Sequence, residues 1–286
     1  MKGSTSPLSE GIQQALQAVE FEYIQQHYWA QNECVVLKHF LSDEVLEHFL
    51  LPEAEKLRAH VHRNYIPRHK KGGSVSYYTL VEKAPAVLTL YRHPALIDFL
   101  SRLVGAPVMP CPEDDPHACA LYFYTEPGDH IGFHYDTSYY RGARYTVLVG
   151  LVQRSQACQL VCQLYKDDPT RARQILQLMT HPGTMVIFNG AKLWHAVTPL
   201  EPRAERIMLT MEYVTDLKMG AFKRFVSNMK DAIAYFGVSA LWRGRPSARR
   251  ASGEARPSTA FSGAVRSASL SRRRARSGTR RRYGDH

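Results

Sequence analysis

The pattern of apolar and polar residues divides the chain into a helical first part and a strand-rich second part. Residues 8–31 carry apolar side chains close to helical spacing, which predicts an amphipathic helix lying on the core. Two more helices are predicted over 43–63 and 85–103, the second broken near His93-Pro94 because proline removes a backbone donor. The rest of this part reads as a strand at 34–37, a flexible basic loop at 64–73, a strand at 74–81 and a loop at 106–117.

From residue 118 the pattern changes to short apolar runs bounded by turns, which is typical of strands. Such runs occupy 120–124, 131–136, 145–151, 159–165, 184–188, 195–199 and 206–214, with a helical or irregular stretch near 168–180. Many short strands at these intervals predict an all-β core with flanking helices, built as a sandwich or jelly roll. A helix over 221–236, with Gly237 as its C-terminal cap, closes this core.

These patterns predict three regions: helices and strands of residues 1–117 that pack on the core, a core over 118–240 and a tail over 241–286. The tail consists mainly of Ser, Gly, Ala, Pro and Arg. It cannot bury enough apolar surface to offset the entropy of ordering, so we predict that it is disordered. From Arg243 to His286 it has 13 Arg against two acidic residues, a net charge of +11. This equals the formal charge of the whole chain, so the body before it is neutral.

The arginine clusters of the tail have two interpretations. Groups such as 272–274 and 280–282 could neutralise phosphates and give salt-sensitive binding to nucleic acid. Against this, Lys, Asn, Ile, Gln, Met and Cys all vanish from the sequence past Trp242. The abrupt change favours a non-homologous or frame-shifted extension, and nucleic acid would contact the chain only through this tail.

Cysteine usage and hydropathy indicate a cytoplasmic protein with no membrane association. The five cysteines form no Cys-x-x-Cys pair, so the sequence indicates neither a zinc ribbon nor a disulfide framework. Cys158 and Cys162 are expected to be small buried hydrophobes. No apolar run approaches the ~18 residues needed to span a bilayer, and the first residues lack the apolar core of a signal peptide.

The candidate chemistry lies in the strand-rich part. His134 and Asp136 are two residues apart at the end of a predicted strand, so their side chains lie on the same face. His195 follows the apolar run 185–188. Two imidazoles and one carboxylate from neighbouring strands make a facial triad, which holds one side of an octahedral Fe(II) and leaves the opposite positions open. Arg206 opens the next strand, and its guanidinium could bind a carboxylate bidentately.

His134-x-Asp136, distal His195 and Arg206 resemble the signature of the Fe(II)/2-oxoglutarate-dependent dioxygenases, and the flanking sequence is most similar to the prolyl 4-hydroxylase-like branch. The resemblance covers roughly residues 30–215 and implies a double-stranded β-helix, or cupin-like jelly roll. It implies that His134, Asp136 and His195 are the catalytic iron ligands and that Arg206 receives the distal carboxylate of 2-oxoglutarate. Fe(II), 2-oxoglutarate and O2 are the implied cofactors and co-substrates, with ascorbate as a reductant.

The same resemblance suggests further residues around the co-substrate. A tyrosine at the position of Tyr124 hydrogen-bonds 2-oxoglutarate in related enzymes, and Thr146 is a second candidate for its carboxylate. Where some hydroxylases of this branch offer a tyrosine, this chain has Gly150, so a second donor to the co-substrate is missing there. Because Asp136 is present, no metal position is vacated for a halide, which counts against a halogenase.

The resemblance implies a hydroxylase that acts on an unactivated C–H bond of a small-molecule or peptidyl substrate and releases succinate and CO2. Basic and aromatic residues at Arg68, Lys70, Lys71 and 137–141 are candidates for a rim that suits an anionic substrate. One alternative is a nucleic-acid demethylase of the same superfamily, although such enzymes usually carry a further Asn and Arg on the last strand. A non-catalytic metal-binding module is a second alternative, and a zinc hydrolase is disfavoured because no general base is evident.

Overall fold

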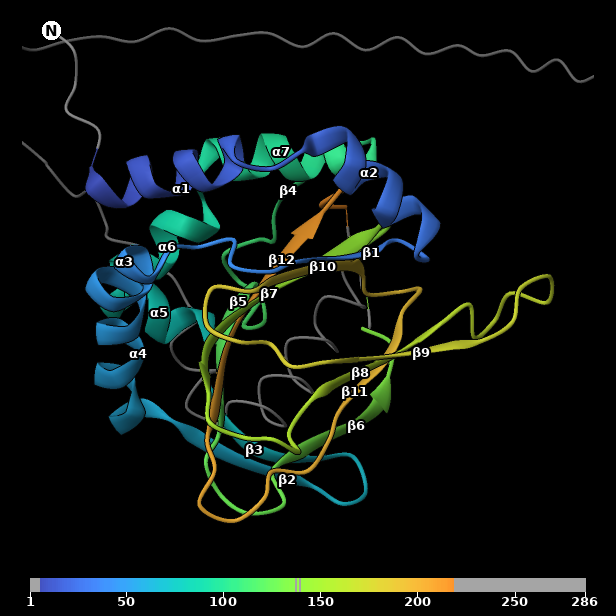
Figure 1. Cartoon of the computed structure of the whole chain (residues 1–286). Coiled ribbons are helices and arrows are strands. Elements are labelled where there is room, and N and C mark those ends of the chain that lie inside the picture. The colour runs from blue at the N-terminus through green and yellow to red at the C-terminus, as the bar shows by residue number, and fades with distance from the viewer. Residues whose placement is uncertain (1–5, 137, 139, 219–286) are drawn as a thin grey trace, which may run out of the picture. The chain divides into compact units, whose positions relative to one another are not determined.

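The computed structural model describes residues 6–136, 138 and 140–218, and its first part is helical (Figure 1). The helices are α1 (Pro7–Gln17), α2 (Phe21–Ala30), α3 (Asp43–Val45), η1 (Leu46–Leu50), α4 (Leu51–Leu57), η2 (Arg58–His60), α5 (Tyr77–Lys83), α6 (Pro85–Tyr91) and α7 (Pro94–Val104). Helices α1, α2 and α7 pack together, and their apolar faces join the main hydrophobic core.

Among the described residues, twelve strands form one sheet in which every pairing is antiparallel. They are β1 (Cys34–Leu37), β2 (His62–Ile66), β3 (Lys70–Val75), β4 (Met109–Pro110), β5 (Cys119–Tyr124), β6 (His130–His134), β7 (Arg144–Gln153), β8 (Leu160–Leu164), β9 (Gln174–Leu178), β10 (Met185–Asn189), β11 (Trp194–Val197) and β12 (Arg206–Val214). The order is β1-β10-β7-β12-β5-β3-β6-β11-β8-β9, with β2 beside β3 and β4 beside β12. The curled sheet confirms the predicted all-β core with flanking helices (Figure 1).

Strand β3 connects the two halves of this sheet. Its residues Gly73–Val75 pair with β5, and Lys70 and Lys71 pair with β6. One half, β1-β10-β7-β12-β5, faces the helices, whereas the other half contains β6, β11, β8 and β9. Side chains of β6, β11 and β12 line one cavity.

Three predicted elements were wrong. Residues 64–73 form most of a β-hairpin, β2–β3, rather than a flexible loop, because β3 pairs with β2 along one edge and with β6 and β5 along the other. The strand predicted at 74–81 ends at Val75, and helix α5 begins directly after Ser76, whose backbone is extended as in a helix N-cap. The stretch 168–180 contains strand β9, which pairs with β8.

The other predicted helices agree with the structure apart from local breaks. Residues 8–31 form two helices that are separated at 18–20, and 43–60 is helical throughout but includes the π-helical segment η1. The break near His93-Pro94 separates α6 from α7, and α7 ends at Gly105, which has a left-handed φ of 72°. The helix predicted over 221–236 and the tail over 241–286 lie outside the described residues.

All five cysteines are free and buried, as expected for Cys158 and Cys162. Within the part of the chain that the structure describes, no helix is long and apolar enough to cross a membrane.

Candidate metal centre and co-substrate pocket

The structure brings His134, Asp136 and His195 together. His134 ends β6, Asp136 follows two residues later, and His195 lies directly opposite His134 in the β11–β6 pairing. One ligand atom from each residue lies within 4.8 Å of the others. Asp136 Oδ1 is 3.5 Å from Nε2 of His134 and 3.6 Å from Nε2 of His195. The three donors therefore face one point, as a facial triad requires.

Backbone carbonyls orient both imidazoles. Nδ1 of His134 lies 2.9 Å from the carbonyl oxygen of Gly132, and Nδ1 of His195 lies 2.9 Å from that of Leu193. A carbonyl can only accept, so each Nδ1 carries the hydrogen and donates. Each Nε2 consequently presents a lone pair toward Asp136, which is the tautomer that a metal ligand needs.

The charges of the triad suit a divalent cation. Burial by itself raises the pKa of Asp136, but the imidazoles of His195 and His134 outweigh it and hold this pKa well below its usual range. Burial lowers the pKa of His195. Burial also opposes the charged form of His134, but the neighbouring carboxylate of Asp136 raises the pKa of that imidazole overall. The site thus combines a carboxylate with imidazole donors, the ligand types found in non-haem Fe(II) centres.

A cavity of about 80 Å³ lies beside the triad, and Arg206 and Tyr124 line it together with the three candidate ligands. Arg206 is the first residue of β12 and is 1% exposed. Its guanidinium carbon lies 5.0 Å from the centroid of the Tyr124 ring, and its Nη2 donates to Oγ1 of Thr180 at 3.0 Å. Its Nε and Nη1 have no hydrogen-bond partner among the described residues.

Two unpartnered donors on a buried guanidinium are energetically costly unless a ligand satisfies them. They belong to a planar, charged guanidinium, the group that recognises carboxylates most strongly. The residues present therefore fit a dicarboxylate such as 2-oxoglutarate, with one end at Arg206 and the other at the triad.

The family model described as Halogenase D matches residues 16–222, which is well over half of the chain. The chain belongs to the halogenase D family. Its membership of the Fe(II)/2-oxoglutarate-dependent oxygenase superfamily, predicted from the motif, is confirmed. The expected cofactors, Fe(II) and 2-oxoglutarate, are those of this superfamily. No curated protein sequence is significantly similar to the chain.

Solved structures share the fold of this halogenase D family member at low sequence identity. The 2-oxoglutarate-dependent epimerase SnoN from nogalamycin biosynthesis is 17% identical, with a TM-score of 0.57 over 71% of this chain and 86% of that chain. A Pseudomonas putida prolyl-4-hydroxylase is 15% identical, with a TM-score of 0.51 over 68% and 98%. A Trichoplax adhaerens prolyl hydroxylase, solved with a hypoxia-inducible-factor peptide, is 13% identical, with a TM-score of 0.53 over 78% and 98%. These likenesses support the double-stranded β-helix.

Thr146, expected beside the co-substrate, lies against the candidate metal ligand instead. Its Oγ1 is 2.7 Å from Oδ2 of Asp136 and 3.0 Å from Oε2 of Glu212. Thr146 also lines the cavity, but its hydroxyl hydrogen is already engaged. Tyr124 lines the cavity as expected, and burial raises the pKa of its hydroxyl, which keeps it a hydrogen-bond donor.

Close packing around Gly150 explains why a tyrosine cannot occupy this position. A Cβ atom there would lie 2.3 Å from the carbonyl oxygen of Thr180 and 2.4 Å from that of His181. The turn before β10 therefore packs directly on the backbone of β7, and a side chain is excluded. The same turn places the Thr180 hydroxyl on Arg206. Sequence reasoning missed Thr180, because it falls in the segment predicted as helical or irregular.

A buried charged network behind the triad was also missed. Glu212 Oε2 accepts from Nε of Arg144 at 2.9 Å, and Arg144 Nη1 lies 3.8 Å from Oδ2 of Asp115. Burial raises the pKa of Glu212 to about 8, although Arg144 opposes the shift. The period of two along β12 could have indicated Glu212, since it puts residue 212 on the same face as Arg206.

The residues predicted to form the substrate rim differ in their exposure to solvent. Arg68 and Arg141 are exposed, whereas Lys70 is 1% exposed with its Nζ 4.6 Å from the centroid of the Tyr122 ring. Burial holds the pKa of Lys70 well below its usual range. Lys71 Nζ donates to the carbonyl of Pro127 at 2.7 Å. Residues 137 and 139 lie outside the described part of the chain, and the role of the rim in substrate binding stays a prediction.

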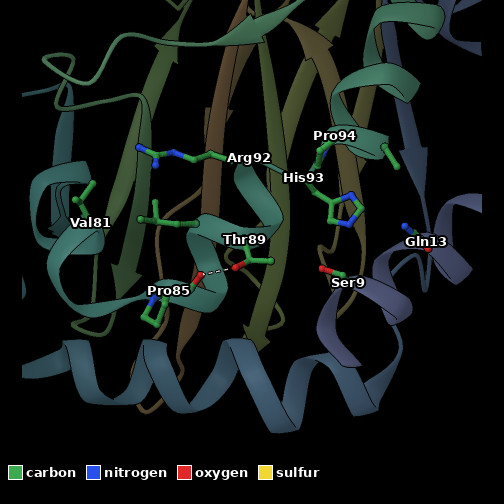
Figure 2. A pocket seen from close by; sticks show the side chains of 10 residues that line it. Ser9, Gln13, Val81, Pro85, Thr89, Arg92, His93 and Pro94 are labelled. Atoms are coloured by element: carbon green, nitrogen blue, oxygen red, sulfur yellow. Dashed lines mark hydrogen bonds between the residues drawn. The ribbon is translucent and has the colours of Figure 1, made fainter. Parts of the chain in front are cut away.

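A larger hollow lies away from the triad. It has a volume of about 750 Å³ and lies between α1 and the segment from α5 to α7 (Figure 2). It is lined by Ser9, Gln13, Val81, Pro85, Leu88, Thr89, Arg92, His93, Pro94 and Ala95. None of the candidate site residues reaches it, so the chemistry belongs to the smaller cavity.

Proposed function

We infer that this protein is an Fe(II)- and 2-oxoglutarate-dependent dioxygenase that hydroxylates an unactivated C–H bond of a small-molecule or peptidyl substrate. Succinate and CO2 are the co-products. The observation that carries this proposal is the cavity in which a His-Asp-His triad faces a buried arginine with two unpartnered donors.

Each side chain then has a defined task. His134, Asp136 and His195 hold Fe(II) on one side. Arg206 binds the distal carboxylate of 2-oxoglutarate with donors that the protein leaves unpartnered, while Thr180 fixes the guanidinium through Nη2. Tyr124 packs against the guanidinium and lines the same cavity. Fe(II) with 2-oxoglutarate and O2 supplies the oxidising chemistry, and the protein supplies orientation and a dry pocket.

The family description raises halogenation as a second candidate. The number of candidate protein ligands to the metal favours hydroxylation over halogenation. His134, Asp136 and His195 would hold Fe(II) on one side and would leave its remaining positions to 2-oxoglutarate and O2. A halide would need a position that Asp136 fills, and this carboxylate is held in place by Thr146.

The test is a screen of small molecules and peptides with anaerobic Fe(II)-loaded protein, 2-oxoglutarate and chloride, followed by admission of O2. Substrate-dependent succinate release, with a product heavier by one oxygen atom, is the expected result. A chlorinated product would overturn hydroxylation but retain the oxygenase. A wild-type protein that binds Fe(II) and releases no succinate with any substrate would favour the non-catalytic metal-binding module.

Two variants make the screen specific. His134→Ala and His195→Ala each remove one donor, so both should lose Fe(II) binding and succinate release together. Arg203→Gln is a matched surface control, because Arg203 lies exposed in the turn before β12. Wild-type rates in His134→Ala would show that the ligand assignment is wrong.

A further inference from the structure

The two carboxylate oxygens of Asp136 have different surroundings. Oδ1 faces Nε2 of both His134 and His195 at 3.5 and 3.6 Å. Oδ2 points to the other side, where it is 2.7 Å from Oγ1 of Thr146. A carboxylate can bind a metal through one oxygen or both, and the hydrogen bond to Oδ2 competes with the second mode.

Thr146 is held where it meets Oδ2. It lies in β7, 2% exposed, opposite Glu212 of β12 and Phe188 of β10. Its hydroxyl has one hydrogen and two carboxylate oxygens within reach, at 2.7 Å on Asp136 and 3.0 Å on Glu212. Arg144 already donates to the same Glu212 oxygen, so the shorter contact to Asp136 takes the hydroxyl hydrogen.

Gly190 closes the same side of the carboxylate. Its carbonyl accepts the backbone N–H of Asp136 at 2.9 Å. A Cβ atom on Gly190 would lie 2.4 Å from Oδ2 and 2.7 Å from Cβ of Asp136. No side chain fits here without moving the carboxylate, so the turn after β10 is shaped around Asp136.

We propose that Thr146, supported by Glu212, and Gly190 are positioning residues that hold Asp136 with Oδ1 alone toward the metal. This inference rests on the proposed function, because it takes Asp136 as an iron ligand. One-oxygen binding leaves three metal positions for the co-substrate and O2, whereas two-oxygen binding would leave two. Thr146 and Gly190 thus set the number of open positions without touching the metal themselves.

The test measures Co(II) binding to the metal-free full-length protein, by titration and by the visible absorption of bound Co(II), in Thr146→Val and Thr146→Ser. Valine matches the shape of threonine but cannot donate. Outer hydrogen-bond partners of metal ligands typically contribute about 10- to 100-fold to metal affinity, and we expect Thr146→Val to lose about 10-fold or more with an altered absorption spectrum. Thr146→Ser retains the hydroxyl and should lie closer to the wild type in both measurements.

Thr184→Val is the matched control, because Thr184 is buried just before β10 and lies outside the cavity lining. Its affinity and spectrum should equal those of the wild type. Gly190→Ala tests whether the space beside Asp136 matters, and it should also change the absorption spectrum of bound Co(II). If Thr146→Val does not fold, the result of Gly190→Ala alone tests the proposal.

Wild-type affinity and spectrum in both Thr146→Val and Gly190→Ala would overturn the proposal. Failure of the ligand assignment would look different. In that case wild-type protein would bind no Co(II), or His134→Ala would bind it as well as the wild type does, and this inference would fall with the assignment.

Discussion

Arg206 offers the sharpest test of the co-substrate pocket. Its guanidinium is 1% exposed, and two of its three nitrogens have no partner among the described residues. A carboxylate bound bidentately by this guanidinium would gain two charge-assisted hydrogen bonds. Each is worth roughly 1.5–3 kcal/mol, so loss of the fork in Arg206→Gln should cost at least about 3 kcal/mol. That is a weakening of about 100-fold in 2-oxoglutarate affinity.

The assay is an anaerobic calorimetric titration, in which the heat of binding is measured as 2-oxoglutarate is added to Mn(II)-loaded protein. Arg206→Lys keeps the charge but loses the planar fork, so its affinity should lie between those of wild type and Arg206→Gln. Metal affinity without 2-oxoglutarate should stay unchanged in both variants, because the contacts that hold Arg206 are with Thr180 and Tyr124, which are not candidate metal ligands.

The control is Arg203→Gln, the same substitution on an exposed arginine three residues earlier. It should bind 2-oxoglutarate as the wild type does. Wild-type affinity in Arg206→Gln, or an equal loss in Arg203→Gln, would refute the reasoning. Global unfolding is not the expected cause, since the substitution removes a buried charge that makes one side-chain hydrogen bond among the described residues, to Thr180. Urea denaturation checks this.

Other predictions concern the metal, the buried ion pair and the tail. EDTA should abolish succinate release, and Fe(II) but not Zn(II) should restore it; full activity in EDTA would contradict an iron centre. Asp129→Asn should lower the free energy of unfolding by about 1.5–3 kcal/mol, because the buried Asp129 loses its charge-assisted hydrogen bonds with Arg63 at 2.6 and 2.8 Å, while Arg63 keeps Glu126 at 2.9 Å. Burial opposes the charge of Asp129, but Arg63 lowers its pKa overall, so this stabilisation is present above about pH 4 and is lost as the pH falls. Acid denaturation should thus be shallower in the variant, and an unchanged midpoint would contradict the assignment. Deletion of residues 243–286 should leave turnover intact, and a collapse of activity would refute the non-homologous-extension hypothesis.

The triad could be predicted because its evidence is local. His134 and Asp136 are separated by one residue in an apolar run, and the strand period alone places them on one face. His195 and Arg206 likewise sit at the starts of runs whose strand character is strong. These positions depend on residue type and spacing, and the structure brings all four into one cavity.

The contacts between strands could not be predicted in the same way. The hydrogen bond from Thr146 to Asp136 depends on the register in which β7 pairs with β10 and β12. No local sequence pattern determines this register. The β2–β3 hairpin was missed because its Lys and Gly residues are poor strand formers by composition. Pairing with β5 and β6 supplies the hydrogen bonds that override this preference.

The double pairing of β3 has a consequence for any attempt to dissect the chain. A fragment that starts at residue 118 would contain every candidate ligand, yet the strand that carries His134 would have lost its bridge to the rest of the sheet. Such a fragment should expose unpaired strand edges and aggregate. Co-expression with a separate 1–117 polypeptide should rescue the solubility of the fragment, because that polypeptide contains β3 and can restore its pairing with β5 and β6.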